Sequence, residues 1–242
     1  MGKVALFVEG LTELVFAREF LIKWHEYDVA VRCYNLFAES YTAEDYQYGE
    51  EGNPKFYQIV NVGNDRLVLT KMLKNAERLK SQGFDLVAGL RDMYCEDYHE
   101  FTQNINNARI IDLNINEQFR KGAYDTILNA AKPVDIRMYF AIMEIETWLL
   151  GMPQFLKRLS RSLTDDTIKG LIDLNEDPEN TIYHPAKLLC DILNCGNMSY
   201  GKHKHDIEAI MSVLEKSDFE QLLNSGKCRS FADFVDGVVE RK

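Results

Sequence analysis

The segment KVALFVEGLTEL, residues 3–14, joins an unbroken apolar run to the beginning of a helix. The run at residues 3–8 shows almost no alternation of polar and apolar side chains, which is typical of a strand buried on both faces of a sheet. Glu9 and Gly10 end the run. Apolar residues then recur at helical spacing over 12–27, behind a threonine that can serve as the N-cap. The segment therefore predicts a strand, a tight turn and a helix.

The alternation of apolar runs and amphipathic segments continues as far as residue 143. Strands are predicted at 29–36, 56–62, 84–90, 110–113 and 136–143, and helices at 65–80 and 117–131. The acidic, tyrosine-rich stretch 37–55 predicts a long loop, and 96–107 predicts a helix or an ordered loop. Alternating strands and helices predict an α/β fold with a mostly parallel sheet flanked by helices.

From Glu144 onward the strand signal disappears, and only helical spacing is left. Short helices are predicted at 148–163, 167–174, 185–193, 206–216 and 231–239, joined by turns that contain Gly, Pro and Asn. The sequence therefore predicts two parts, with a boundary near Gly151. These are an α/β domain at 1–150 and an appended C-terminal helical subdomain at 151–242.

The composition is that of a globular protein. Of the 242 residues, 46% are hydrophobic and 27% are charged, which is well outside the disordered range. No apolar run approaches the roughly 18 residues that span a bilayer, and the first residues lack the pattern of a signal peptide. We therefore expect a cytoplasmic chain with no membrane association. The oligomeric state stays open, a homodimer included.

Cysteine usage and net charge narrow the classes of function. The five cysteines form no C-x-x-C pair, so a disulfide framework is not indicated. A zinc site is a minor alternative, and its ligands would be Cys190, Cys195, His203 and His205. The net charge of −10 disfavours a protein that coats nucleic acid. It leaves room for an enzyme that holds a single phosphate through metal ions.

Acidic residues follow three of the predicted strands. Glu9 follows the first strand, Asp92 follows the strand at 84–90, and Glu144 and Glu146 follow the strand at 136–143. Ligand sites of open parallel sheets lie beyond the carboxyl ends of the strands. Carboxylates gathered at one edge repel each other unless a cation lies between them. The sequence therefore predicts a Mg²⁺ or Mn²⁺ site, although each acid taken singly is equally explained as a strand end meeting solvent.

Several residues near these acids are candidates for contacts with a phosphate. Gly10 lets the backbone approach a ligand closely, and the helix that follows it presents an N-terminus that favours an anion. Glu13 is either a partner of the helix dipole or part of the acidic site. Lys202 and, more weakly, Lys204 are the basic side chains expected opposite the acids. A solvated turn explains these lysines equally well.

The segment VALFVEGLTE at 4–13 resembles the first motif of TOPRIM domains. It is most similar to that of small TOPRIM-like bacterial proteins related to the overcoming-lysogenisation-defect nucleases. LRDMY at 90–94 resembles the second acidic motif, and AIMEIETWLL at 141–150 resembles a Glu-x-Glu-x-Trp stretch of the same proteins. Three shorter matches follow in the same order, namely HPAK at 184–187, YGK at 200–202 and CRSF at 228–231.

The resemblance implies a TOPRIM-like fold in which Glu9 acts as a general acid or base or as a metal ligand. In TOPRIM enzymes an Asp-x-Asp pair holds magnesium, but this sequence has Tyr94 two residues after Asp92. The second metal-binding carboxylate must therefore come from elsewhere in the chain or be absent. Glu146 is the better candidate by motif, and Glu96 and Glu144 are nearby additions.

The leading hypothesis is a Mg²⁺- or Mn²⁺-dependent nuclease that acts on DNA or RNA. Glu9, Asp92 and Glu146 would bind the metal, and Lys202 would stabilise phosphate charge. The resemblance further implies a role in bacterial defence against phage or mobile elements, beside a separately encoded ATPase. Two alternatives stay open. One is a catalytically weak partner subunit of such an ATPase complex, and the other is a metal-dependent phosphatase acting on a small substrate.

Overall fold

Strand β1 (Lys3–Val8) lies inside a six-stranded sheet in the computed structural model, which describes residues 2–103 and 110–240. The order of strands is β3-β2-β4-β1-β5-β6. β1 pairs in parallel with β4 and β5, β2 pairs in parallel with β4, and β3 runs antiparallel to β2. The predicted α/β fold with a mostly parallel sheet is therefore confirmed. The bounds of the other strands are β2 (Ala30–Phe37), β3 (Ser40–Ala43), β4 (Phe56–Asn61), β5 (Phe84–Asp92) and β6 (Asp135–Ala141).

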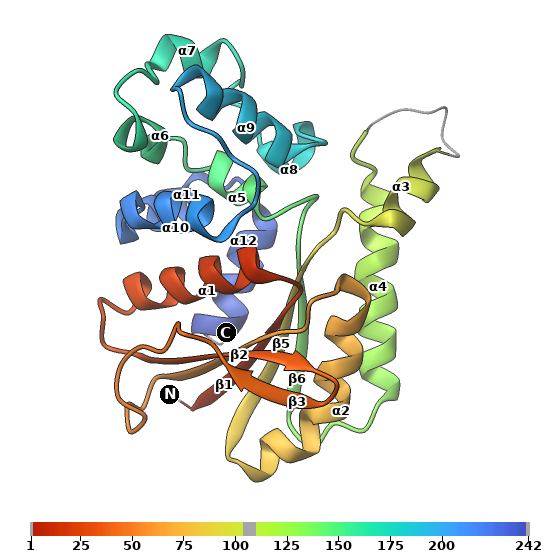
Figure 1. The fold of residues 1–242 in the computed structure, drawn as a ribbon. Helices are drawn as coiled ribbons and strands as arrows, with labels where there is room; N and C mark the ends of the chain where they lie inside the picture. The colour runs from red at the N-terminus through yellow and green to blue at the C-terminus, as the bar shows by residue number, and fades with distance from the viewer. Residues whose placement is uncertain (1, 104–109, 241–242) are drawn as a thin grey trace. The chain divides into compact units, whose positions relative to one another are not determined.

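Helices cover both faces of the sheet, which explains why β1 is apolar throughout (Figure 1). Ala5 and Phe7 belong to a buried cluster with side chains of α2 (Val68–Ser81) and with Ile127 of α4 (Leu113–Asn129). Successive side chains of a strand point to opposite faces, so Val4, Leu6 and Val8 face the other way, toward the side of α1 (Leu11–Trp24). All of these β1 side chains except that of Lys3 are buried.

The face of the sheet that carries α1 is closed by a segment distant in sequence. Phe234 packs on Phe20 of α1, with ring centroids 6.1 Å apart, and on Tyr139 of β6, with centroids 5.7 Å apart. The helical segment η2 (Val235–Glu240) follows and buries Val235 and Val238. This part of the chain thus contributes to the core of the sheet.

The chain forms two compact units that are discontinuous in sequence. Unit 1 contains the chain up to Arg91, Asn116–Phe140 and the residues from Asp233, whereas unit 2 contains Asp92–Ile115 and Ala141–Ala232. The predicted division at Gly151 differs from this, because the ends of β5 and β6 already lead into unit 2. The helices after β6 are α5 (Glu146–Leu150), α6 (Gln154–Leu159), α7 (Asp165–Lys169), α8 (Pro178–Thr181), α9 (Pro185–Cys195), α10 (Lys204–Val213), α11 (Lys216–Ser225) and α12 (Arg229–Phe234).

The prediction of a long acidic loop at 37–55 is wrong in part. Ser40–Ala43 form β3, and Tyr48 bridges back to Val31 of β2. Ala38 and Glu39 make the hairpin turn with φ angles of 46° and 66°. Left-handed turns of this kind usually carry Gly or Asn, so the sequence gives no hairpin signal here.

The strand predicted at 110–113 is also wrong, because Leu113 begins α4. The Asp112 carboxylate accepts hydrogen bonds from the backbone N–H of Asn114 at 2.8 Å and of Ile115 at 3.2 Å. It therefore satisfies free donors of the first helical turn, as an N-cap residue does. The helix alternative for 96–107 is confirmed as α3 (Glu96–Gln103), and the part of that prediction at 104–107 lies outside the described residues.

The helical nature of the chain after β6 is confirmed, although the boundaries shift. The helix predicted at 148–163 is two helices, α5 and α6, separated by Pro153, which cannot donate a backbone hydrogen bond. Helix α11 was not predicted. Among the described residues, no helix combines the length and the apolar character that crossing a bilayer requires.

A substitution at Gly49 tests the close contact between the segment after β3 and the backbone at the beginning of β2. Its φ is +68°, and a Cβ atom at this position would lie 2.2 Å from the carbonyl oxygen of Val29. We expect Gly49→Ala to lower the free energy of unfolding by about 1–3 kcal/mol, because a side chain is both strained and obstructed there. Urea unfolding measures the change. Gly52→Ala is the matched control, since nothing lies within 4 Å of its Cβ, and equal effects of the two changes would contradict the contact.

Candidate metal centre

The ends of β5 and β6 bring three acidic residues together in unit 2. β5 ends at Asp92. The chain after it bonds to the end of β6 through Met93 N–H to Ala141 O at 2.9 Å, and to the residues after β6 through Tyr94 N–H to Met143 O at 2.8 Å. Met143 has a φ of 61°, and this left-handed turn redirects the chain immediately before Glu144.

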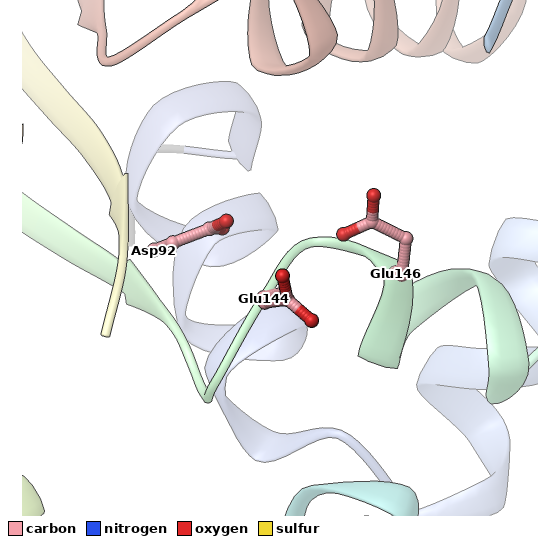
Figure 2. Close-up of side chains that lie close together, drawn as sticks. All are labelled: Asp92, Glu144 and Glu146. Atoms are coloured by element: carbon pink, nitrogen blue, oxygen red, sulfur yellow. The ribbon is translucent and has the colours of Figure 1, made fainter. Parts of the chain in front are cut away.

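The three carboxyl groups of Asp92, Glu144 and Glu146 converge on a common space (Figure 2). One ligand oxygen from each lies within 4.8 Å of those of the others. Asp92 belongs to a strand end, Glu144 to the turn after β6, and Glu146 to the first turn of α5. The convergence therefore depends on how the chain continues from the ends of β5 and β6.

In Asp92 and Glu144, one carboxylate oxygen is anchored by a backbone N–H. Asp92 Oδ1 accepts a hydrogen bond from Ile145 N–H at 2.9 Å. Glu144 Oε2 accepts one from Ala186 N–H at 3.0 Å, in the first turn of α9, where unpaired N–H groups favour an anion. Asp92 is 5% exposed, so its orientation is set by the protein rather than by solvent.

Glu146 follows the same pattern with a side-chain donor. Its Oε1 accepts a hydrogen bond from the hydroxyl group of Tyr200 at 2.6 Å. Glu146 is 0% exposed, and its Oε2 accepts no hydrogen bond within the described residues. A wholly buried carboxylate oxygen in that state is costly unless a cation lies near it.

Lys202 supplies that cation. Its Nζ lies 2.7 Å from Glu144 Oε1, 3.3 Å from Glu146 Oε2 and 3.9 Å from Asp92 Oδ2. These are the three oxygens that do not accept the anchoring hydrogen bonds. Each acid is therefore held by one oxygen and turns the other toward the ammonium group.

The loop that carries Lys202 is held in place by Asp206. The Oδ2 atom of Asp206 accepts hydrogen bonds from Gly201 N–H at 2.8 Å and from His203 N–H at 3.0 Å. Lys202, between these two donors, has a φ of 59°. A non-glycine residue in the left-handed region is strained and persists where the surroundings enforce it, as this clamp does.

The electrostatics of the cluster follow from its burial. Burial raises the pKa of Glu146 above its ordinary value, and repulsion from Glu144 adds to this, against the opposing effects of Lys202 and Tyr200. Burial alone would lower the pKa of Lys202, but attraction to Glu146, Asp92 and Glu144 outweighs it and raises that pKa. Lys202 is therefore charged at neutral pH.

The structure brings together four of the residues singled out from the sequence, namely Asp92, Glu144, Glu146 and Lys202. Tyr94, which stands where TOPRIM enzymes have the second aspartate, packs its ring edge-on against Tyr183 and His184, with centroids 5.7 Å and 5.6 Å away. Glu144 is the carboxylate that joins Asp92 and Glu146 in its place.

Glu9, Gly10 and Glu13 lie together in unit 1, at the turn between β1 and α1. Gly10 is the N-cap of α1, and its carbonyl oxygen accepts the hydrogen bond from Leu14 N–H at 3.1 Å. Glu13 is 4% exposed, and its Oε2 lies 3.0 Å from where a Cβ of residue 10 would be. A carboxylate thus lies beside the helix N-terminus that was predicted to bind phosphate.

The other predicted ligands lie outside the acidic cluster. Glu96 is exposed in the first turn of α3, and Lys204 is exposed at the beginning of α10. Within the described part of the chain, the His, Cys, Asp and Glu side chains form a single group of three or more with converging ligand atoms, and it is the acidic cluster. The zinc alternative of Cys190, Cys195, His203 and His205 is therefore not supported.

Sequence reasoning missed the residues that anchor the site. Tyr200 and Ala186 were quoted only as members of short motifs, and Asp206 was placed only in a helix. Ala186 N–H binds a carboxylate 42 residues away, and the Tyr200 hydroxyl group binds one 54 residues away. Neither contact leaves a signal in the local sequence. Asp206 has a signal in principle, since an acid three residues after His203 forms a capping box.

The donor set fits a hard divalent cation. Mg²⁺ and Mn²⁺ prefer carboxylate oxygens, and three of these converge here, one of them buried and without a hydrogen bond. Comparison of the chain with protein-family models, with curated proteins and with solved structures found no match.

The raised pKa of Glu146 has a consequence for stability. A carboxyl group whose pKa is raised by folding contributes stability below its unfolded pKa of about 4.3, and that contribution is lost as the pH rises through the folded value. Glu146→Gln removes this ionisation. We therefore expect the free energy of unfolding of Glu146→Gln, relative to the wild type, to increase between pH 4.5 and pH 8.

Urea unfolding at four pH values, in the presence of EDTA, measures this difference. Glu220→Gln is the control, because Glu220 is half-exposed in a surface ion pair with Lys216 and its difference from the wild type should stay nearly flat. A flat profile for Glu146→Gln as well would contradict a raised pKa at this site.

Proposed function

We propose that this chain is a Mg²⁺- or Mn²⁺-dependent nuclease of TOPRIM-like fold that hydrolyses phosphodiester bonds in DNA or RNA. The observation that carries the proposal is the set of three carboxylates, each anchored by one oxygen, whose other oxygens face a lysine ammonium. Anchored carboxylates at the ends of neighbouring strands can hold a divalent ion, which is one way to support phosphoryl chemistry.

In this proposal Asp92, Glu144 and Glu146 hold the divalent ion. When bound, the ion supplies Lewis-acid stabilisation of the phosphoryl oxygens. The hydrogen bonds to Ile145 and Tyr200 keep two of these carboxylates in place without further reorganisation.

Two further residues complete the proposed chemistry. Lys202 offsets the negative charge that develops on the phosphate, and its stem is long enough to follow that charge. Glu9 moves a proton or adds a metal ligand, an assignment that comes from the resemblance of residues 4–13 to the first TOPRIM motif. Roles for Gly10 and Lys204 in phosphate binding have the same status.

The biological setting is proposed from the resemblance alone. Small TOPRIM-like proteins of this kind would act in defence against phage or mobile elements, beside a separately encoded ATPase. A catalytically weak partner subunit of such an ATPase is the corresponding non-enzymatic reading.

The central test is cleavage of plasmid DNA, single-stranded DNA and transfer RNA by the purified chain in Mg²⁺ or Mn²⁺. We expect Asp92→Asn to reduce the rate by about a hundredfold or more, the scale on which loss of one group that stabilises a transition state acts. EDTA should abolish cleavage. Glu220→Gln, which also removes one negative charge, should cleave at the wild-type rate. Full activity in Asp92→Asn would exclude the acidic cluster as the catalytic centre.

Glu9→Gln separates the role of Glu9 from that of the cluster. If Glu9 moves a proton or binds metal, the variant should lose cleavage by about a hundredfold while its thermal unfolding stays close to that of the wild type. Unchanged cleavage, in an assay where Asp92→Asn is inactive, would show that the cluster works without Glu9. The TOPRIM assignment of Glu9 would then be wrong.

A small-substrate phosphatase is the second candidate, and the net charge of −10 favours it over an enzyme that follows a long polyanion. Hydrolysis of p-nitrophenyl phosphate in the same buffers decides between the two. A metal-dependent phosphatase would release p-nitrophenol and leave all three nucleic acids intact. A partner subunit would do neither.

A further inference from the structure

We propose that Lys202 is a tethered counter-ion that holds the cation position among Asp92, Glu144 and Glu146, and that a divalent metal ion binds there by displacing it. This inference rests on the metal centre of the proposed function and adds how that centre is regulated. In this proposal Lys202 competes with the metal ion for the cluster. The alternative is that Lys202 stays in its present position when the metal ion is bound.

The first argument is the identity of the oxygens. Nζ of Lys202 faces Glu144 Oε1, Glu146 Oε2 and Asp92 Oδ2, whereas the partner oxygen of each carboxylate accepts a hydrogen bond from the protein. A metal ion held by the three carboxylates would bond to the oxygens that face the ammonium, at about 2.0–2.2 Å. An ammonium nitrogen 2.7 Å from Glu144 Oε1 and a divalent ion cannot share that space.

The second argument is charge. Three carboxylates against one ammonium leave an excess of negative charge in a site where Glu146 is wholly buried. Burying carboxylates without a cation is strongly unfavourable, so either Lys202 or a metal ion must be present. A divalent ion neutralises the three carboxylates better than one ammonium does, which gives the exchange its driving force.

The third argument is that Lys202 can leave without disturbing its loop. Its side chain is 36% exposed, so part of the side chain already lies at the surface. The backbone on either side stays fixed, because Gly201 and His203 donate to Asp206 independently of the lysine side chain. A flexible four-carbon stem on a clamped backbone suits such a movement.

The exchange has a measurable effect on affinity. When a competing group occupies a site, the apparent Kd of the ligand equals its intrinsic Kd divided by the fraction of molecules in which the site is free. If Lys202 occupies the cluster in nine molecules of ten or more, its removal tightens metal binding by about tenfold or more. Simple coexistence predicts no such gain.

Calorimetric titration of the full chain with Mn²⁺ and with Mg²⁺ tests this. We expect the Kd of Lys202→Met to be at least about tenfold lower than that of the wild type. Lys157→Met is the matched control, because it removes the same charge from an exposed pair with Asp165 and should leave the Kd unchanged. An equal or weaker Kd for Lys202→Met would overturn the proposal.

A second measurement needs no variant, which matters if Lys202→Met fails to fold. Reductive methylation of the wild-type protein, read by mass spectrometry, reports how available each lysine is. Modification of Lys202 should be slow in EDTA and about tenfold or more faster at saturating Mg²⁺, whereas Lys157 should react equally in both. An unchanged rate at Lys202 would show that the metal does not displace it.

Neither measurement depends on cleavage, so the two proposals can fail separately. Tighter metal binding by Lys202→Met, together with no cleavage of nucleic acid by the wild-type protein, would keep the counter-ion and reject the nuclease. Metal-dependent cleavage with an unchanged Kd and an unchanged methylation rate would keep the nuclease and reject the counter-ion. Absence of Mg²⁺ and Mn²⁺ binding in both proteins would reject the counter-ion outright.

Discussion

Three carboxylates in unit 2 must share one cation, and the local structure around them is arranged to meet that constraint. Asp92, Glu144 and Glu146 would repel one another if they were free to ionise side by side. Each instead gives one oxygen to a fixed donor and the other to Lys202. The strand ends, the first turn of α9 and the loop at 200–203 all contribute to this one arrangement.

The parts of the site that follow from strand geometry could be predicted from the sequence. Parallel strands end at the same edge of a sheet, so the acid at the end of β5 and the acids after β6 were expected to meet, and they do. The anchors could not be predicted in this way. Tyr200 binds Glu146, which lies 54 residues away in the sequence. The left-handed turn at Met143 contains no glycine from which it could have been predicted. Both depend on tertiary packing, which overrides local preference.

The errors in the fold have equally specific causes. The hairpin between β2 and β3 turns through Ala38 and Glu39, two residues that rarely adopt a positive φ. At the beginning of α4, a short apolar stretch predicted a strand, but Asp112 caps a helix there. The unbroken apolar run of β1 and the amphipathic spacing of α2 were predicted correctly, because burial constrains the sequence of these segments more than it constrains a turn.

The contact of Phe234 with Phe20 and Tyr139 has a consequence for biosynthesis. A ribosome makes residues 92–232, most of which belong to unit 2, before it makes the segment that closes unit 1. The contact of Phe234 with the aromatic surface of α1 therefore cannot form until the last part of the polypeptide has been made. Nascent chains with exposed apolar surface are prone to aggregate and to engage chaperones. The sheet is the first part of this protein to be translated and among the last to be completed.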